Sequence, residues 1–480
     1  MRSPPVGEEI SRIHFNDEDF ARFEERLADE SRRFRELSRG GGLTNEGFCL
    51  GFEIEAWLVD RNCFPSPTNT EFLAALGSSL VVPELSRFNV EINGTPQPVR
   101  ERAFARLEAE LNNTWRHCLD VAHGMDRGLL LIGILPTIRK SDLTMANVSV
   151  LRRYVALNQQ ILKRRGGRPI EIDISGIESL HIEHADVMLE AAATSFQVHL
   201  QVPAGETVRF YNASLIASAP VLALGVNSPF LFDHLLWQET RIPLFEQAVA
   251  ILPPGADPVD RRVSFGAGYL RDGVDEYFTD IFHRYPVLLP IVSDAPLDSF
   301  AHLRLHNGTI WRWNRPLVGF DTSGRPHVRI EHRVLPAGPS ILDMLANAAF
   351  YTGLVTALAR DSRPPEQELP FDTARDNFYT AARHGLESRI AWRSVTDLPV
   401  RELLLDELLP LARHGLRMQA IDPDDIDRYL DVLEARVRSG QTGAAWQCRW
   451  TELHGRDFLK LGAAYLERQR NGAPVHEWNL

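Results

Sequence analysis

The chain has 480 residues, of which 44% are hydrophobic and 24% are charged, and it carries a net charge of −12. This length supports a large core with two or more structural units, and the composition is that of an ordinary globular protein. The acidic balance argues against nucleic acid and anionic membranes as partners, because basic patches are what bind them.

The first third of the chain predicts helices around a set of strands. A charged amphipathic pattern predicts a helix over 17–38, which ends at a run of glycines. Residues 45–100 predict strands separated by turns rich in Pro, Asn and Gly. A helix is predicted over about 101–126, and a short buried strand follows at 129–136.

The middle of the chain mixes both element types. Residues 150–202 predict a helix, the alternating segment "PIEIDISG", a second helix and the alternating segment "SFQVHLQV". The longest uncharged run, 210–232, is long enough to span a membrane, but its polar and proline residues favour a buried helix near 212–226. A loop-rich region and alternating segments around 301–335 follow.

Helical periodicity dominates from about residue 340, apart from the loop "DSRPPEQELPFD". Blocks of strands followed by blocks of helices predict an α+β fold rather than regular βαβ alternation. We expect an N-terminal helical extension over 1–44, a catalytic core over 45–360, and a helical part over 361–480 that packs on the same domain.

Four alternating segments each carry one apolar face and one face of functional side chains. In "GFEIEAWLVD", for example, Glu53 and Glu55 point the same way because side chains alternate along a strand. The other polar faces carry Asn89, Glu91 and Asn93; Gln197, His199 and Gln201; and Arg329, Glu331 and Arg333.

These polar faces have two interpretations. For any single segment, an antiparallel sheet with one face in water explains them. Taken together, the polar faces predict one shared site, because they consist of carboxylates, amides, a histidine and arginines, with almost no lysine. Carboxylates that converge on such a site repel each other unless cations neutralise them. Oxygen ligands with one imidazole suit Mg²⁺ or Mn²⁺, and arginines suit phosphate or a substrate carboxylate. The combination is typical of phosphoryl transfer.

Other motifs are absent or weaker. The chain has no GxxxxGK[ST] loop, no GxSxG elbow and no HExxH zinc signature. His181 and His184 are three residues apart, but the surface of a helix is the simpler interpretation. Glu171 and Asp173 repeat the paired carboxylates without a clear apolar partner face. "LRLHNGTIWRWNRP" places Arg304, Arg312 and Arg315 near two tryptophans, which fits either packing or a nucleotide or substrate role.

Six segments in a consistent order give a family resemblance. They resemble the glutamate–cysteine ligase type 2 family, also called carboxylate–amine ligases, in the glutamine-synthetase-like superfamily. The segments are "GFEIEAWLVD", "NVEINGTPQP", "TSFQVHLQV", "YNASLIASAPVLALGVNSPF", "HVRIEHRVLPAG" and "DNFYTAARHGL". The resemblance implies a curved antiparallel sheet of about six strands that forms a funnel, with helices packed on its outside.

The resemblance also implies an activity and roles for residues. Members bind ATP and Mg²⁺, phosphorylate a carboxylate, typically that of glutamate, and let an amine displace the phosphate. The implied Mg²⁺ ligands are Glu53, Glu55, Glu91, His199 and Glu331. Arg333 would stabilise the transferring phosphoryl group, and Arg241 would hold the substrate carboxylate. Further candidates for substrate contact are Arg312, Arg329, Gln197, Asn227 and, more weakly, Arg383.

The leading hypothesis is therefore an ATP-dependent ligase that forms a γ-glutamyl-type amide through an acyl phosphate. The alternatives are a phosphotransferase that stops at the phosphorylated substrate and a non-catalytic nucleotide- or metabolite-binding regulator. We expect small-molecule partners, with C-terminal helical surfaces that leave room for a homodimer. Four scattered cysteines and an N-terminal stretch without an apolar signal core predict a cytoplasmic location.

Overall fold

The computed structural model describes residues 10, 12–252 and 257–480. Its centre is an antiparallel sheet of six strands in the order β11–β12–β8–β1–β3–β2. Two short strands, β4 and β5, also pair with β1. The strands are β1 (Cys49–Val59), β2 (Val81–Pro83), β3 (Asn89–Asn93), β4 (Gln97–Pro98), β5 (Gly128–Leu130), β8 (Ser195–Gln201), β11 (Asn314–Phe320) and β12 (Pro326–Pro336). The predicted α+β class with a curved six-stranded sheet is confirmed.

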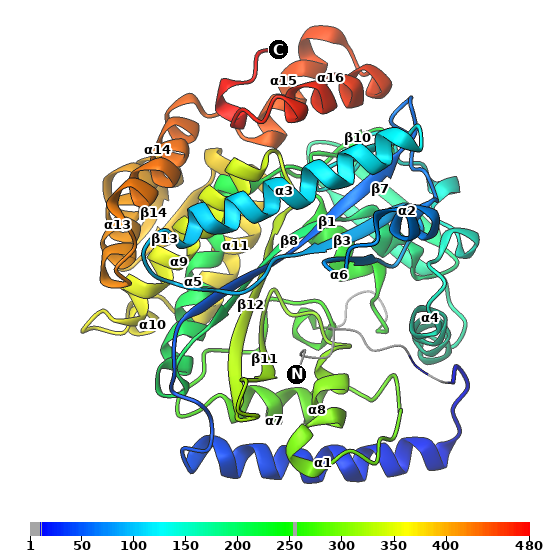
Figure 1. Ribbon diagram of the computed structural model, residues 1–480, viewed down its shortest axis with the longest axis vertical. Helices are drawn as coiled ribbons and strands as arrows, with labels where there is room; N and C mark the ends of the chain where they lie inside the picture. Colours follow the sequence, from blue (N-terminus) through cyan, green and yellow to red (C-terminus); the bar gives the residue numbers. More distant parts are fainter. Residues whose placement is uncertain (1–9, 11, 253–256) are drawn as a thin grey trace.

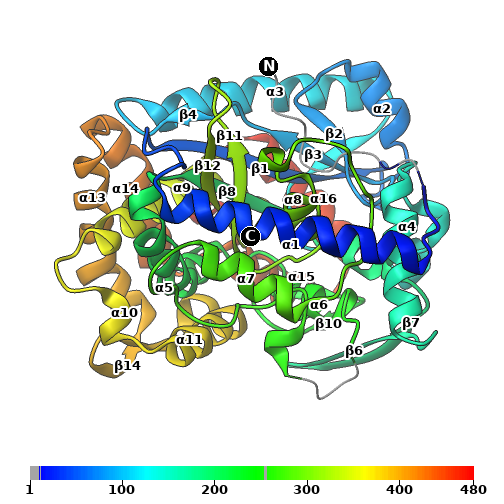
Figure 2. The ribbon, with the colours of Figure 1, turned by 90° about the horizontal axis from the view of Figure 1, so that it is seen from below.

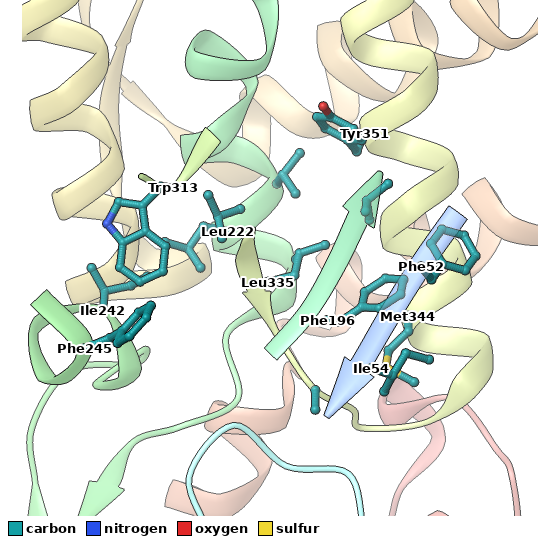
Figure 3. Packing of buried hydrophobic residues seen from close by; sticks show 14 of the residues in the cluster. Phe52, Ile54, Phe196, Leu222, Ile242, Phe245, Trp313, Leu335, Met344 and Tyr351 are labelled. Atoms are coloured by element: carbon teal, nitrogen blue, oxygen red, sulfur yellow. The ribbon is translucent and has the colours of Figure 1, made fainter. Parts of the chain in front are cut away.

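Alternation along the strands gives the sheet one largely apolar face, on which His332 and Asn314 are buried polar exceptions that bond to each other. Phe52, Ile54 and Phe196 on this face are at most 2% exposed, and they belong to one hydrophobic cluster with Leu222 of the helix Thr207–Gly225 and Met344 of the helix Ile341–Ala359 (Figure 3). Burying such side chains stabilises the fold by about 1.5–3 kcal/mol each. The opposite, polar face is thereby left to line the site.

The helices surround this sheet (Figure 1). One buried pair, α5 and α9, covers the apolar face, whereas α1 lies at the opposite end of the molecule from α15 and α16. The helices are α1 (Asp17–Arg39), α2 (Asn69–Leu76), α3 (Ala103–Gly124), α4 (Arg152–Arg164), α5 (Thr207–Gly225), α6 (Arg241–Ala248), α7 (Asp275–Arg284), α8 (Ala301–Asn307), α9 (Ile341–Ala359), α10 (Pro365–Glu368), α11 (Phe371–His384), α12 (Val400–Leu403), α13 (Leu409–Met418), α14 (Pro423–Ser439), α15 (Gly443–His454) and α16 (Phe458–Arg470).

Helix α1 begins at a capping box, as its sequence favours. Asn16 Oδ1 accepts from the Asp19 N–H at 2.9 Å, and Asp19 Oδ2 accepts from the Asn16 N–H at 3.0 Å. The predicted helix over 17–38 is confirmed. The division of the chain at residues 44 and 360 stays a prediction.

Three local predictions differ from the structure. The second helix predicted within 150–202 is present only as a short 3-10 helix over Val187–Ala192, and the residues before it form β7 (Ser179–His184), which makes a hairpin with β6 (Ile170–Ser175). Leu180, Ile182 and His184 pair with the isoleucines of β6, so alternation outweighs the helical spacing of the histidines. Residues 301–307 form α8 rather than a strand, and the C-terminal part contains the hairpin of β13 (Arg389–Trp392) and β14 (Val395–Pro399).

Among the residues that the structure describes, one helix, α9, is long and apolar enough to cross a membrane. It is 94% buried inside the protein, so its apolar length is explained by its central place in the core. Helix α5 covers most of the uncharged run of the sequence, and nearly all of its residues are buried too. The sequence prediction of a buried helix there is confirmed, although the helix starts earlier, at Thr207.

Candidate active site

The polar face of the sheet lines a cavity of about 540 Å³. Its walls come from segments far apart in the chain, including α4, α8 and the segment before β8. Among the lining residues are the predicted Glu53, Glu55, Glu91, Gln197, Arg241, Arg329 and Arg333, together with Glu84, Arg153, Glu190, Arg304 and Arg315.

Three buried side chains from neighbouring strands meet at one point of this face. Glu53, His199 and Glu331 each offer a ligand atom, and these atoms lie within 4.8 Å of one another. His199 Nε2 is 3.3 Å from Glu53 Oε1 and 3.9 Å from Glu331 Oε1. Strand register explains the meeting, because Glu331 lies opposite His199, and Glu53 lies opposite Gln197, two residues before His199 on the same face.

The carboxylate of Glu331 is fixed by two arginines. Arg315 donates from Nε and Nη2 to its two oxygens at 2.9 Å each, and Arg333 donates from Nη1 at 3.1 Å. Burial raises the pKa of Glu331, but the charges of Arg315 and Arg333 outweigh burial and hold this pKa well below its ordinary value. Glu331 is therefore an anion with one orientation.

His199 is held by a hydrogen bond from Arg329. The Arg329 Nε–H donates to His199 Nδ1 at 3.1 Å. Because a guanidinium only donates, Nδ1 is the unprotonated nitrogen in this arrangement and Nε2 carries the proton. Nε2 is buried, faces the two carboxylates and has no hydrogen-bond partner among the described residues. For Nε2 to ligate a cation, Arg329 must turn away from Nδ1.

The group of three fits a divalent cation. Two carboxylates and an imidazole are donor types found in Mg²⁺ and Mn²⁺ sites. Burial raises the pKa of Glu53, and the neighbouring His199 and Arg333 outweigh this effect, so its pKa lies below its ordinary value. Two carboxylate anions converge at this point, and a cation would neutralise both, with Nε2 as a third ligand once the proton has moved from Nε2 to Nδ1 and Arg329 has turned away.

The other two predicted ligands, Glu55 and Glu91, line the cavity but lie outside this group of three. They stand opposite each other on β1 and β3. Glu55 accepts from the Ser195 N–H at 2.7 Å, the Ser195 hydroxyl at 2.8 Å and Gln197 Nε2 at 3.2 Å. Burial, and next the charge of Glu84, raise the pKa of Glu55 to about 7; burial raises that of Glu91 well above its ordinary value.

Arg333 and Arg241 differ in what their guanidinium groups contact. Arg333 Nη1 donates to Gln197 Oε1 at 2.5 Å, while its Nε has no partner among the described residues. Arg241 donates to the backbone carbonyls of Arg333 and Val334 and lies over the Trp313 ring at 5.3 Å. Arg241 thus supports the strand that carries Arg333, from the cavity wall.

The sequence does not single out Glu84 and Glu190, and it names Arg315 only together with Arg304 and Arg312, for packing or a nucleotide or substrate role. Arg315 lies opposite Glu331 in the β11–β12 hairpin, and counting outward from the tight turn at 321–325 would have paired them. Glu190 stands alone in an apolar run, which is itself a signal of function. Glu84 comes directly after the short strand β2, which ends at Pro83, and nothing in the local sequence indicates that Glu84 belongs to a site.

Three other predicted contacts lie away from this cavity. Arg312 is buried between the rings of Tyr277 and Tyr285 and pairs with Asp280. The Asn227 amide donates to Ala337 O and the Tyr465 hydroxyl at 2.8 Å each, and Gln447 donates to its oxygen at 3.0 Å. Arg383 lies over Trp237 and borders a second cavity.

The paired residues of β6 and β7 also lie elsewhere. His181, Glu171 and Asp173 do not line the main cavity, and His184 Nδ1 lies 2.9 Å from the Asp186 carbonyl. In the part of the chain that the structure describes, these residues form no group with metal-ligand spacing. Glu171 and Asp173, the paired carboxylates without a clear apolar partner face, are therefore separate from the site on the central sheet.

Comparison with known proteins relates the whole sheet and its surroundings to one group of enzymes. The model of glutamate–cysteine ligase family 2 matches residues 49–458. The structure resembles the glutamate–cysteine ligase of Francisella tularensis in complex with AMP, with a TM-score of 0.55, 13% identity, and coverage of 89% of this chain and 90% of that one. It also resembles a bifunctional glutathione synthetase from Pasteurella multocida, with a TM-score of 0.54 and 12% identity, over 92% of this chain and 55% of that one.

Comparison with curated protein sequences finds no match. At 12–13% identity the two structural likenesses establish the fold, which the chain shares with these two enzymes, and the family match covers most of the chain. The strands that carry Glu53, His199 and Glu331 all lie inside the matched range. The chain is a member of glutamate–cysteine ligase family 2, and it has the fold and class of a carboxylate–amine ligase.

Proposed function

We propose that the chain is an ATP-dependent ligase that phosphorylates an amino-acid carboxylate and transfers the acyl group to an amine. The expected carboxylate is the γ-carboxylate of glutamate. The observation that carries this proposal is the buried Glu53–His199–Glu331 group with Arg333 beside it, at a cavity of about 540 Å³ in a member of this family. The AMP bound to the Francisella tularensis ligase supports a nucleotide in this cavity.

Glu53, Glu331 and His199 would hold Mg²⁺, or Mn²⁺ in its place, with Glu55 and Glu91 as further candidate ligands. Such an ion, when bound, neutralises phosphate charge. Arg333 would donate to the oxygens of the transferring phosphoryl group, because its Nε is unpartnered and its Nη1 is oriented by Gln197 and Glu331. Arg315 would keep Glu331 in one orientation.

The amine step needs a group that accepts a proton. The amine nitrogen bonds to the acyl carbon, the carbon–oxygen bond to phosphate breaks, and one amine proton must leave. Glu190 lines the cavity, and burial, followed by the nearby charge of Glu84, raises its pKa to about 8. A carboxylate with a pKa near neutrality is suited to general-base catalysis, and we assign this role to Glu190.

The test is a matrix of amino acids and amines with ATP and Mg²⁺, in which ADP and phosphate are quantified and products are identified by mass spectrometry. The ligase hypothesis expects ADP, phosphate and amide in equal amounts for one pair of substrates. A phosphotransferase would give ADP and a phosphorylated amino acid without amide. ATP binding without turnover for any pair would favour a regulatory binder and contradict the proposal.

A further inference from the structure

A second wall of the cavity lies on the segment 289–305, which runs into the turn Leu297–Ser299 and helix α8. Seven of its residues line the cavity: Leu289, Ser293, Ala295, Ser299, Ala301, Arg304 and Leu305. Helix α1 runs along the outside of α7 and α8 (Figure 2). We call the segment 289–305 the substrate wall and ask what holds it in place.

A buried relay connects α1 to this wall. Glu30 and His302 are both 0% exposed, and His302 Nδ1 lies 2.7 Å from Glu30 Oε1. The second Glu30 oxygen accepts from the Leu303 N–H at 2.8 Å, and His302 Nε2 accepts from the Ser293 N–H at 3.1 Å. Since Nε2 is an acceptor, Nδ1 carries the proton, and Glu30 fixes this tautomer. The relay thus runs from α1 to the backbone of a residue that lines the cavity.

Further contacts from α1 hold the same wall. Arg26 donates to Ala295 O at 2.7 Å. Phe300 is fully buried and has a φ of 51°, a left-handed conformation that a bulky residue rarely adopts. Phe34 of α1 packs edge-on against the Phe300 ring at 5.6 Å. Because strained residues persist only where their surroundings fix them, this packing indicates that the position of the wall matters.

The wall presents a free hydrogen-bonding group. The Ser299 hydroxyl oxygen is buried, and it has no partner among the described residues although Ser299 lines the cavity. Buried hydroxyls without a partner are uncommon, and a bound ligand is one way to satisfy them. Ile10, which precedes α1, also lines the cavity. Both Ile10 and α1 lie before residue 49, where the family match begins.

We propose that α1 is a positioning element of the site: the Glu30–His302–Ser293 relay sets the substrate wall so that Ser299 contacts the amino-acid substrate. The relay does not take part in phosphoryl transfer, because its residues lie on α1 and on the wall and not on the strands with the acidic group. The identity of the substrate rests on the proposed function. The positioning itself does not.

The first test is amide hydrogen exchange of Glu30→Gln. A glutamine at this position keeps one acceptor oxygen, so either the Leu303 N–H or the His302 Nδ1–H loses its partner. We expect amides in 289–305 to exchange at least about tenfold faster, while strands β1, β8 and β12 keep their protection. Glu25→Gln, the same change on the exposed face of α1, is the matched control and leaves the exchange unchanged.

The second test is kinetic. Ser299→Ala and Glu30→Gln should each raise the KM for the amino acid about tenfold, the loss of one hydrogen bond, with kcat and the KM for ATP within about threefold of wild type. Ser299→Ala should leave amide exchange unchanged. Unaltered exchange in Glu30→Gln overturns the relay, and an unaltered KM in Ser299→Ala overturns the contact. If the wild-type protein turns over no substrate pair, the proposed function fails, and amide exchange still decides the positioning.

Discussion

The two walls of the cavity are built in different ways. On the sheet, Glu53, His199 and Glu331 are placed by strand register, and each sits two residues from another polar side chain on the same face. On the substrate wall, positions depend on contacts between α1 and a segment more than 250 residues away, such as Glu30 with His302. The first wall is made of paired strands and lies within the family match, whereas the second depends on a helix, α1, that lies outside the match.

The contrast suits a division of roles, in which the sheet carries out phosphoryl transfer and the substrate wall selects the substrate. Groups that neutralise and transfer phosphate must keep fixed distances, and a sheet supplies them with little freedom. Groups that select the substrate need not keep such fixed distances, and a wall held by a helix outside the family match can be changed without disturbing the strands. We therefore expect substitutions on the sheet to lower kcat, and substitutions on the wall to change KM.

The largest effect should follow from Glu53→Gln. This change removes one carboxylate charge from the group of three but keeps the shape of the side chain, so turnover should fall by at least about a hundredfold. Circular dichroism should be unchanged. Binding of Mn²⁺, followed by electron paramagnetic resonance, should weaken in parallel, and turnover near that of wild type would contradict the assignment of the cation site.

Arg333→Lys should have the second-largest effect on turnover. An ammonium cannot replace the planar guanidinium that contacts both Gln197 and Glu331, so we expect kcat to fall about a hundredfold with KM values little changed. Single-turnover measurement of ADP formation would locate the loss in the phosphoryl step. A loss confined to KM would mean that Arg333 binds substrate and does not stabilise the transferring group.

Arg315→Lys tests a residue that acts through Glu331, whose carboxylate it holds in one orientation. Its bidentate bond holds Glu331, and without it we expect kcat to fall about tenfold and the melting temperature to drop, because a buried carboxylate loses a partner. Arg312→Lys is a suitable control, since Arg312 is equally buried but contacts Tyr277, Tyr285 and Asp280 away from the cavity. That control should lose stability and keep its turnover.

Glu190→Gln addresses the second half of the reaction. If Glu190 accepts the amine proton, its removal should lower amide formation about tenfold or more, while the amine-independent part of ADP release is retained. Glu183→Gln on the exposed face of β7 is the matched control. Equal losses of ADP release and amide formation would place Glu190 in the first step instead.

The smallest effect on turnover is expected for Asn227→Ala. Asn227 is 0% exposed, and its amide group bonds to Ala337, Tyr465 and Gln447. Its loss should destabilise the fold by about 2–3 kcal/mol, read as a lower midpoint in urea unfolding, with kcat/KM within about twofold of wild type. A strong rise in KM at unchanged stability would mean that Asn227 contacts the substrate and would contradict this prediction.

The spacing of apolar and polar residues along the chain explains which features of the fold and of the site could be predicted from the sequence. Alternation alone placed Glu53 with Glu55 and Glu331 with Arg333 on shared faces, and the order of the motifs gave the fold. The sequence names Arg312 and Arg315 together, because two-residue alternation does not tell which arginine a hairpin pairs with Glu331; that depends on where the turn falls. The Glu30–His302 contact and Glu84 depend on long-range packing, for which local sequence carries no signal.

The most direct test of the account is product analysis in the substrate matrix, with the wild-type protein and Glu53→Gln run side by side. The account predicts that the wild type forms ADP, phosphate and an amide in equal amounts with one amino acid and one amine, and that Glu53→Gln forms about a hundredfold less of all three. Equal turnover by both proteins, or ADP without amide from every pair, would contradict it.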